Sequence, residues 1–505
     1  MTRPTKWHAS RAFPVLTALT MLALTGCAVS PSPMSLSDRQ ATLQADRQNM
    51  FGHQEPLSGP VSLQEAMARA LKYNLDYRVK LMEEAMAQRQ LDLSSLDMLP
   101  KLAVAAGYTA RNKDNASSSQ NVVTGEQSLV PSISSEKHSS TADLSLSWNV
   151  LDFGVSYYTA QQQSDRVLIL QQRKRKVAQQ LIQQVREAWW QAVGAQQLEN
   201  RIDTLLAETN RALEDARQVE KLKLRAPLEM LNYRRQLLDV IRQMGMVRNT
   251  LAQAKPRLAA IMNVPPGTDF QVAVPKGLPT PELGIKLEQM EEMALLGRPE
   301  LNEARYNERI NVTETRKAIA KLLPGLEFSV GQHYDSNKFL VNNSWGDAGL
   351  RVSWNLLNLF SAGPITKAAD AQLQVAQAQR MALNMAVLTQ VHVAYLDWQG
   401  KSRQFAQEQE LNDVEQRIYQ QNRNATDSGV QGRLPAILAD ANAVFSTLRL
   451  YQSYGDLQNS YGQMASSLGL DALPESTSSY ELPALTTAFQ GAETHWQSQV
   501  AGSKQ

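Results

Sequence analysis

Few residues in this chain have the types and spacing that covalent or metal chemistry requires. The single cysteine excludes an internal disulfide and any zinc or redox site built from cysteines. The histidines do not show the short spacing of metal ligands; they are His8, His53, His138, His333, His392 and His495. Asp152-Phe153-Gly154 spells a kinase tripeptide, but no glycine-rich loop or His-Arg-Asp segment accompanies it. The sequence therefore predicts a protein that is not an enzyme and needs no cofactor or metal.

The cysteine itself follows a leader-like segment. Three basic residues precede an apolar run over residues 13–24, and Leu24-Thr25-Gly26-Cys27 comes next. This order is similar to a bacterial lipoprotein signal, which implies that residues 1–26 are removed and that Cys27 carries a covalent lipid such as palmitate. Ala28 is not the aspartate associated with inner-membrane retention, so the expected location is the outer membrane. An ordinary secretory signal with an incidental cysteine is the alternative.

The charge of the remaining chain is nearly balanced. Residues 1–26 contain three basic and no acidic residues, which leaves 48 basic against 49 acidic residues. Such balance gives no general attraction for nucleic acid. The basic run at residues 173–176 is expected to be a helix face that is solvated or that faces lipid headgroups. After Leu24 no apolar stretch reaches about 20 residues, so no membrane-spanning helix is predicted.

The strongest signal in the sequence is a duplication of secondary-structure patterns. Residues 143–150 alternate polar and apolar side chains as a half-buried strand does, and residues 349–356 repeat the pattern 206 positions later. Residues 177–192 and 383–398 then place apolar side chains at spacings of four, four, three and four, which mark one helix face. A strand that leads into a long helix is therefore predicted as the repeated unit.

The patterns divide the chain into six segments. They are a signal peptide (1–26), an extended lipid-anchored tether (27–61), a first repeat (62–263), a linker (264–284), a second repeat (285–470) and a polar tail (471–505). The tail is expected to be partly ordered against the helices. Each repeat is expected to contain a helix, a β-hairpin, a long helix and a returning helix. In chain order these are 63–98, 102–150, 156–225 and 228–262, and then 286–323, 326–358, 364–427 and 434–468. In the first repeat the two shorter helices together match the long one in length, which predicts antiparallel packing along it.

Two hairpins supply only four strands, which are too few for a membrane barrel. About eight strands is the smallest common number, and open strand edges would be unsatisfied in lipid. Oligomerisation would satisfy these edges, and three chains would supply twelve strands. The alternative is a soluble coiled-coil envelope lipoprotein whose hairpins form a small cap.

Over about residues 62–470 the chain resembles the TolC-type outer-membrane efflux proteins. The resemblance lies in the order of these elements, in the strands around Trp148 and Trp354, and in the turns at residues 225–227 and 428–435. The resemblance implies a mainly α fold with β strands. Duplicated long antiparallel helices would form a periplasmic tunnel, and a trimeric twelve-stranded barrel would cross the outer-membrane lipid. It also implies a passive exit duct that works with a periplasmic adaptor and an inner-membrane pump in tripartite efflux. Type I protein or polysaccharide secretion through the same kind of duct is the alternative.

The resemblance also implies a gate at the turns between the long and returning helices. Asp440 matches an inward-facing carboxylate ring, whereas Ile437 stands where the family's prototype has another aspartate, so strong cation selectivity is not expected. Arg433 resembles a latch arginine, Glu229 is its expected partner on a neighbouring helix pair, and Asn232 lies at a matching position. An exposed ion pair contributes about 0–1 kcal/mol, but three symmetric copies act together on one opening equilibrium. The alternative is that Glu229 and Arg433 are only solvated charges at helix starts.

Overall fold

The computed structural model describes residues 31–470, 473 and 479–500, and the chain divides into two units, residues 1–54 and 55–505. The expected signal peptide and Cys27 lie outside the described residues. In the first unit, α2 (Leu36–Phe51) begins with a capping box made by Ser35 and Asp38. The expectation of an extended tether is therefore wrong over this stretch, because a good cap precedes residues with high helix propensity, such as Ala, Leu, Gln and Arg.

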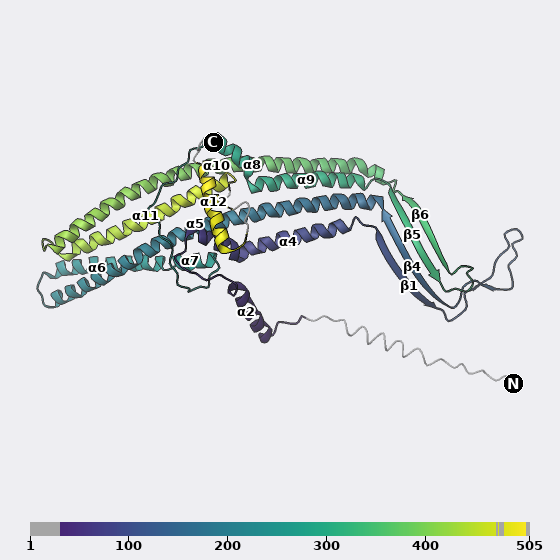
Figure 1. Cartoon of the computed structure of the whole chain (residues 1–505), viewed down its shortest axis with the longest axis horizontal. Helices are drawn as coiled ribbons and strands as arrows, with labels where there is room; N and C mark the ends of the chain where they lie inside the picture. The colour runs from purple at the N-terminus through teal and green to yellow at the C-terminus, as the bar shows by residue number, and fades with distance from the viewer. Residues whose placement is uncertain (1–30, 471–472, 474–478, 501–505) are drawn as a thin grey trace, which may run out of the picture. The chain divides into compact units, whose positions relative to one another are not determined.

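The second unit is built along two long helices, α5 (Val150–Lys221) and α10 (Asn358–Asp427), each of which runs beside shorter helices. The shorter helices nearer the sheet are α4 (Leu75–Leu96) and α9 (Pro299–Ala320). Those nearer the opposite end are α6 (Pro227–Leu251) and α11 (Arg433–Ser467). Helix α5 contacts all four of them, and α10 contacts α9 and α11 (Figure 1). Each long helix is thus covered along its length by two successive sets of shorter helices.

The helix that precedes each hairpin is broken, although the sequence predicts one continuous helix in each place. The preceding pieces are α3 (Leu63–Tyr73) and α8 (Leu287–Gly297), which have the same length. Asn74 and Arg298 at the breaks adopt extended backbone conformations. Asn74 accepts a hydrogen bond from the backbone N–H of Tyr77, and Pro299 disfavours a helical conformation at the residue before it. The returning helix of the first repeat is likewise divided into α6 and α7 (Ala254–Ile261).

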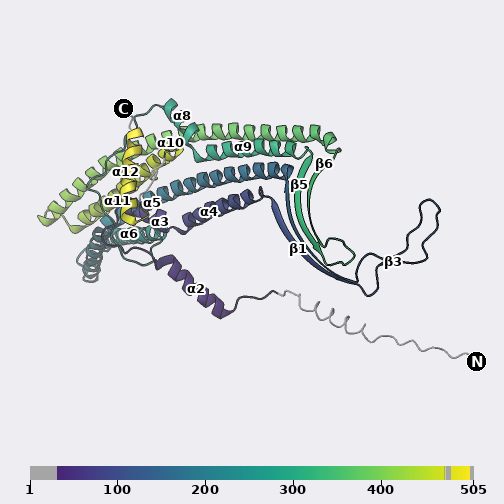
Figure 2. The ribbon, with the colours of Figure 1, turned by 45° about the vertical axis from the view of Figure 1, so that its right-hand side comes forward.

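The four predicted strands form one antiparallel sheet in the order β1-β4-β5-β6. They are β1 (Lys101–Ala110), β4 (His138–Asn149), β5 (Gly325–Asp335) and β6 (Ser344–Ser353). The two hairpins join through β4 and β5, so the duplication brings them side by side. Figure 2 shows the curved strands continuing from the ends of the long helices. The first hairpin loop also contains a short ladder of β2 (Ala116–Ser117) with β3 (Ser132–Ile133), where the sequence suggests only a loop.

The two faces of this sheet differ in character. One face carries exposed apolar side chains from every strand, for example Val104, Leu146, Val330 and Leu350. The ladder registers place these residues on the same face, with Leu146 directly opposite Val330, and the alternate positions hold mostly small or polar residues. An apolar face that stays exposed needs a partner, which for a curved antiparallel sheet can be lipid.

Two helix starts differ from the sequence prediction. Helix α5 begins at Val150 rather than near residue 156, because the Asn149 side chain accepts a hydrogen bond from the backbone N–H of Leu151 at 2.9 Å. Gly154, which the sequence suggests as the end of the strand, lies inside this helix. Helix α10 begins at Asn358 rather than at Pro364, which lies within its first two turns. Helix starts therefore depend on local capping contacts as well as on periodicity.

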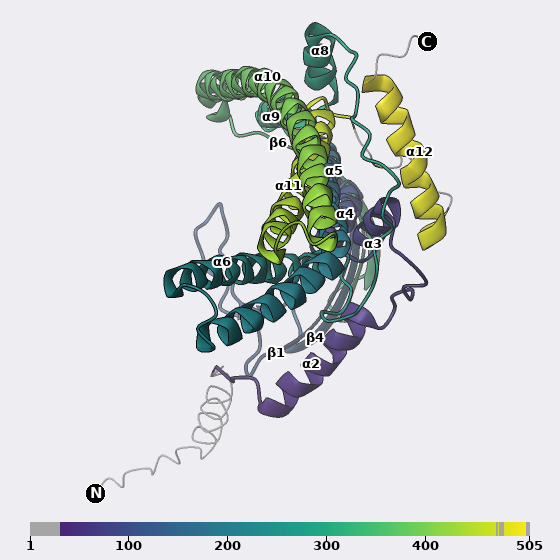
Figure 3. The same cartoon turned by 90° about the vertical axis from the view of Figure 1, so that its left-hand side faces the viewer.

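The expected linker and tail both contribute to the core. In the linker, Phe270 and Val272 are buried, and Val272 forms a β-bridge with Val61. In the tail, residues 482–500 form α12 (Leu482–Val500), which contacts α3 (Figure 3) and buries Phe489 and Trp496. This agrees with the expectation that the tail is partly ordered against the helices, since its apolar residues recur at helical spacing and pack against the other helices.

The described part of the chain contains no helix that is both long and apolar enough to cross a membrane.

Candidate functional site

The long helices end in two turns at the end of the second unit that lies away from the sheet (Figure 1). Between α5 and α6, Lys223 adopts a positive φ of 52°. Between α10 and α11, Gly429 has a φ of 74°, a conformation that glycine adopts without steric cost. Pro227 at the start of α6 tolerates the first helical position because its missing N–H would have no intrahelical partner there.

A cavity of about 620 Å³, here called the tip cavity, lies beside these turns. Helices α5, α6 and α11 line it, and three of the predicted gate residues, Glu229, Asn232 and Arg433, belong to its wall. The structure therefore brings residues from both repeats to one place. The other two predicted gate residues lie deeper between the helices.

Charged residues around the tip cavity form two ion pairs within the chain. Arg433 Nη1 lies 3.4 Å from Asp215 Oδ2 on α5, and Arg225 Nη1 donates to Glu229 Oε1 at 2.8 Å. Within one chain, Arg433 thus pairs with Asp215, whereas Glu229 pairs with Arg225 four residues before it. All four side chains are more than half exposed, so each pair contributes about 0–1 kcal/mol.

Asp440 is buried between the helices and paired with an arginine of α5. Arg201 Nε and Nη2 donate to Asp440 Oδ1 at 3.0 and 2.8 Å, and the Asp440 side chain is only 9% exposed. Burial raises the pKa of Asp440, whereas the charge and hydrogen bonds of Arg201 act in the opposite direction. In this arrangement the carboxylate that the sequence places in an open ring is neutralised inside the helix wall.

Arg201 also connects α5 to α10. Its Nη1 donates to Gln416 Oε1 at 2.9 Å, and its guanidinium lies 4.9 Å from the centre of the Tyr419 ring. Gln416 in turn donates to Thr447 Oγ1 of α11 at 2.9 Å. One arginine therefore holds three helices together through a connected polar network.

Ile437 is 4% exposed and packs in an apolar cluster with residues of α5, α6 and α11, including Leu213, Leu237 and Val444. The predicted apolar ring therefore has no exposed side chain at this position in the single chain. An isoleucine that points between helices gains more from apolar burial than one that lines water.

The sequence prediction omits three residues of this region. Arg225 could be found from its spacing of four residues before Glu229, which places the two charges on one helix face. Arg201 and Asp215 carry no such signal, because their partners are more than 200 positions away in the sequence. In the described residues, no group of three or more His, Cys, Asp or Glu side chains could hold a metal ion.

The second half of the chain matches a known protein family. Residues 291–470, from α8 to the end of α11, match the model of the family described as outer membrane efflux protein. Over this segment the chain is similar to the outer membrane efflux proteins. No curated protein matches this chain at the sequence level.

Solved structures of outer-membrane channels are similar to this chain in fold. The channel CmeC of Campylobacter jejuni has a TM-score of 0.63 at 14% identity and covers 88% of this chain and 93% of its own. The open state of MtrE from Neisseria gonorrhoeae has a TM-score of 0.61 at 14% identity, covering 81% and 88%. VceC of Vibrio cholerae has a TM-score of 0.60 at 14% identity, covering 81% and 96%.

The family match and the fold of the similar structures agree on the general role of this chain. It is an outer-membrane exit duct of the kind that serves tripartite efflux, and it is a channel rather than an enzyme. Channels of this family are trimers that act with adaptor and pump partners, and they need no cofactor. The predictions of fold class, family and channel function are confirmed.

Proposed function

We propose that three copies of this chain form one duct, with a twelve-stranded barrel in the outer membrane and an α-helical tunnel that is gated at the tip cavity. The observation that carries this proposal is the four-stranded sheet with one apolar face. Within the sheet, β1 and β6 each have only one strand neighbour. Joining β1 of one copy to β6 of the next would satisfy these edges and turn the apolar face to lipid.

The proposed gate consists of the two exposed ion pairs at the tip, Arg433 with Asp215 and Arg225 with Glu229, together with Asn232. Each pair is weak, so a partner can break it at low cost. Deeper in the wall, Asp440 would keep α11 fixed to Arg201 while the tip moves, and Ile437 would act as a core residue of the same helices. Docking of adaptor helices beside the turns at residues 217–226 and 424–435 remains a prediction.

Conductance of the purified protein in planar lipid bilayers tests both parts of this proposal. The full chain is expected to give discrete conductance steps. Arg433→Ala removes one pair in each of three copies, about 0.5 kcal/mol each, so the ratio of open to closed channels should rise about tenfold. Arg242→Ala is the matched control, because it removes an equally exposed pair, with Asp239, outside the tip cavity.

Two results would contradict the proposal in different ways. A bilayer that stays sealed at every voltage would reject the duct and favour the alternative of a coiled-coil spacer lipoprotein. Conductance steps that are the same in Arg433→Ala, Arg225→Ala and the wild type would keep the duct but reject the gate.

We also propose that Cys27 carries a covalent lipid that anchors the chain to the outer membrane. The support is the order of the basic, apolar and small residues before it. Mass spectrometry of the N-terminal peptide is expected to find Cys27 as the first residue, with added acyl mass. The Cys27→Ala variant should keep residues 1–26, whereas Ala28→Ser should be processed as the wild type is. An unmodified N-terminus that begins at another residue would exclude the anchor.

A further inference from the structure

Three charged side chains, Asp143, His333 and Asp347, lie together on the face of the sheet opposite the apolar face, and they are here called the histidine cluster. His333 of β5 is three positions from Val330 of the apolar face, and successive strand residues point to opposite faces. His333 Nδ1 lies 2.6 Å from Asp143 Oδ1 of β4, and His333 Nε2 lies 3.2 Å from Asp347 Oδ2 of β6. One imidazole ring therefore lies between carboxylates of two neighbouring strands.

The sheet leaves room for the histidine cluster and keeps it open to solvent. A Cβ at Gly331 would lie 2.6 Å from His333 Nε2 and 2.9 Å from Asp347 Oδ1, so this glycine makes space for both side chains. The His333 ring also stacks on Trp345, with the ring centres 5.4 Å apart. The side chains of Asp143, His333 and Asp347 are 41%, 23% and 59% exposed. The ring is therefore held in place while dissolved ions can approach the carboxylates.

The charge of the histidine cluster depends on one proton. Both ring nitrogens of His333 face a carboxylate, and only the protonated ring carries an N–H on each nitrogen. Two carboxylates and one imidazolium give a charge of −1, whereas two carboxylates and a neutral ring give −2. Histidine is the side chain whose ordinary charge change falls between about pH 5 and 8. In three copies the total would therefore change from −3 to −6 as the pH rises.

The neighbouring charges on this face are of types that keep their charge over the same range. On β5 they are Asp335 and Glu327, which lie two and six residues from His333. Arg351 of β6 lies directly opposite Glu327, and Lys101 of β1 lies opposite a residue of β4 that shares the face of Asp143. Carboxylates, lysine and arginine do not ordinarily change charge between about pH 5.5 and 9. Proton binding at His333 is therefore the charge change expected on this face.

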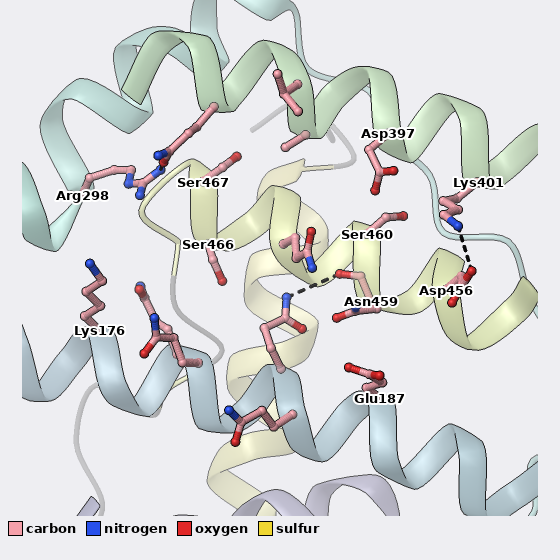
Figure 4. A pocket seen from close by; sticks show the side chains of 18 of the residues that line it. Lys176, Glu187, Arg298, Asp397, Lys401, Asp456, Asn459, Ser460, Ser466 and Ser467 are labelled. Atoms are coloured by element: carbon pink, nitrogen blue, oxygen red, sulfur yellow. Dashed lines mark hydrogen bonds and ion pairs between the residues drawn. The ribbon is translucent and has the colours of Figure 1, made fainter. Parts of the chain in front are cut away.

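A larger charged region, a polar groove of about 980 Å³ lined mainly by α5, α10 and α11, gives a useful contrast (Figure 4). Lys401 lies 2.7 Å from Asp456, as the dashed line in Figure 4 shows, and Lys176 lies 3.1 Å from Glu300. The hydrogen bond that Lys401 donates to Asp456 raises the pKa of Lys401. No histidine is among the described residues that line the groove. Its charge is therefore expected to stay constant where that of the histidine cluster changes.

We propose that the histidine cluster sets the ion selectivity of the channel, which favours cations more strongly when His333 loses its proton. The inference rests on the proposed twelve-stranded duct, in which turning the apolar face to lipid turns this face to the water-filled interior. Rings of carboxylates that line a pore favour cations, and an imidazolium between the carboxylates offsets part of their charge. Selectivity would then be set within the strands, far from the gate proposed at the tip.

Reversal potentials of the full-length protein in planar lipid bilayers under a KCl gradient test this inference. Salt is kept at or below about 0.1 M, where the screening length is about 10 Å or more. The ratio of K⁺ to Cl⁻ permeability is expected to rise about threefold between about pH 5.5 and pH 9, the scale of one added charge per copy close to a passing ion. His333→Gln, which is neutral at both pH values, should have the high ratio at both.

Two further variants control for general effects. His333→Lys keeps a positive charge at both pH values and should therefore have the low ratio at both. His138→Gln is the matched control, because His138 belongs to the same sheet but lies on the opposite face, where its Nδ1 is 3.1 Å from the Tyr108 hydroxyl. This variant should keep the full pH dependence of the wild type. Conductance steps of wild-type size show that each variant has assembled.

The outcomes decide this inference separately from the duct. A permeability ratio that rises with pH in the wild type and in His138→Gln, but not in His333→Gln or His333→Lys, supports it. A ratio that is independent of pH in the wild type, or that rises as much in His333→Gln, overturns it while the conductance steps keep the duct. A bilayer that stays sealed at every voltage overturns the duct and this inference with it.

Discussion

Replacing Arg201 with alanine is expected to lower the free energy of unfolding by about 3 kcal/mol, because it leaves the buried Asp440 carboxylate without its counter-charge. Removing one partner of a buried pair costs about 3–5 kcal/mol, and we take the lower end because Arg201 is 28% exposed. Chemical denaturation of the detergent-solubilised protein, followed by circular dichroism, measures the effect. The double variant Arg201→Ala/Asp440→Ala should recover most of the loss, since it no longer buries a lone charge.

The loss of stability in the single variant Arg201→Ala should become smaller at low pH. Burial already raises the pKa of Asp440, and loss of Arg201 removes the interactions that oppose this rise. The folded state then binds a proton at Asp440 more tightly than the unfolded state does. The loss in free energy of unfolding, relative to the wild type, should therefore shrink as the pH falls through the raised pKa. Arg217→Ala, which breaks an exposed pair with Glu214 on the same helix, should cost at most about 1 kcal/mol. An equal cost for Arg201→Ala and Arg217→Ala would refute this account of Asp440.

Gly469→Ala is expected to destabilise the protein by about 3 kcal/mol, because the added methyl group has no room. Gly469 ends α11 with a φ of 73°, and a Cβ there would lie 2.4 Å from the carbonyl carbon of Gly297. The left-handed backbone costs a residue with a side chain about 1–2 kcal/mol, and forced overpacking costs about 1–3 kcal/mol. Backbone atoms make the contact, so a change of side-chain rotamer cannot relieve it.

Gly400→Ala is the matched control for this prediction. Gly400 lies inside α10, and its added Cβ would meet nothing within 4 Å. Alanine is the better helix former by about 1 kcal/mol, so this variant should be slightly more stable than the wild type. Thermal unfolding of both variants checks the pair of predictions. A Gly469→Ala protein as stable as the wild type would show that the contact with Gly297 is not tight in solution.

The spacing of apolar residues and the duplication of that pattern predict the architecture of this chain well. Both follow from the burial of side chains along helices and strands. The alternation over residues 143–150 and 349–356 identifies two of the four strands, and the apolar spacing over residues 177–192 identifies the first long helix. The errors concern helix ends and breaks. Asn149 starts α5 early because its side chain accepts hydrogen bonds from the backbone N–H groups of Leu151 and Asp152, and such contacts leave no trace in periodicity.

The candidate site was less predictable, because its interactions connect distant parts of the chain. The sequence places Asp440 and Ile437 on the returning helix but does not fix the rotation of that helix about its axis. The structure turns Asp440 toward Arg201 and Ile437 into the apolar cluster. Contacts between helices set that rotation, and they depend on residues more than 200 positions away.

In the second repeat, one side chain of α5 holds the ends of two shorter-helix segments together. The start of α9 and the end of α11 meet beside α5, where Arg175 donates hydrogen bonds to the carbonyl oxygens of both Gly297 and Gly469. A related contact in the first repeat runs from the Asn74 side chain to the carbonyl oxygen of Ile261. Each repeat thus combines one continuous long helix, α5 or α10, with shorter helices that are separated by breaks. Because one side chain of α5 holds both ends, neither end can slide along α5 without breaking its hydrogen bond to Arg175.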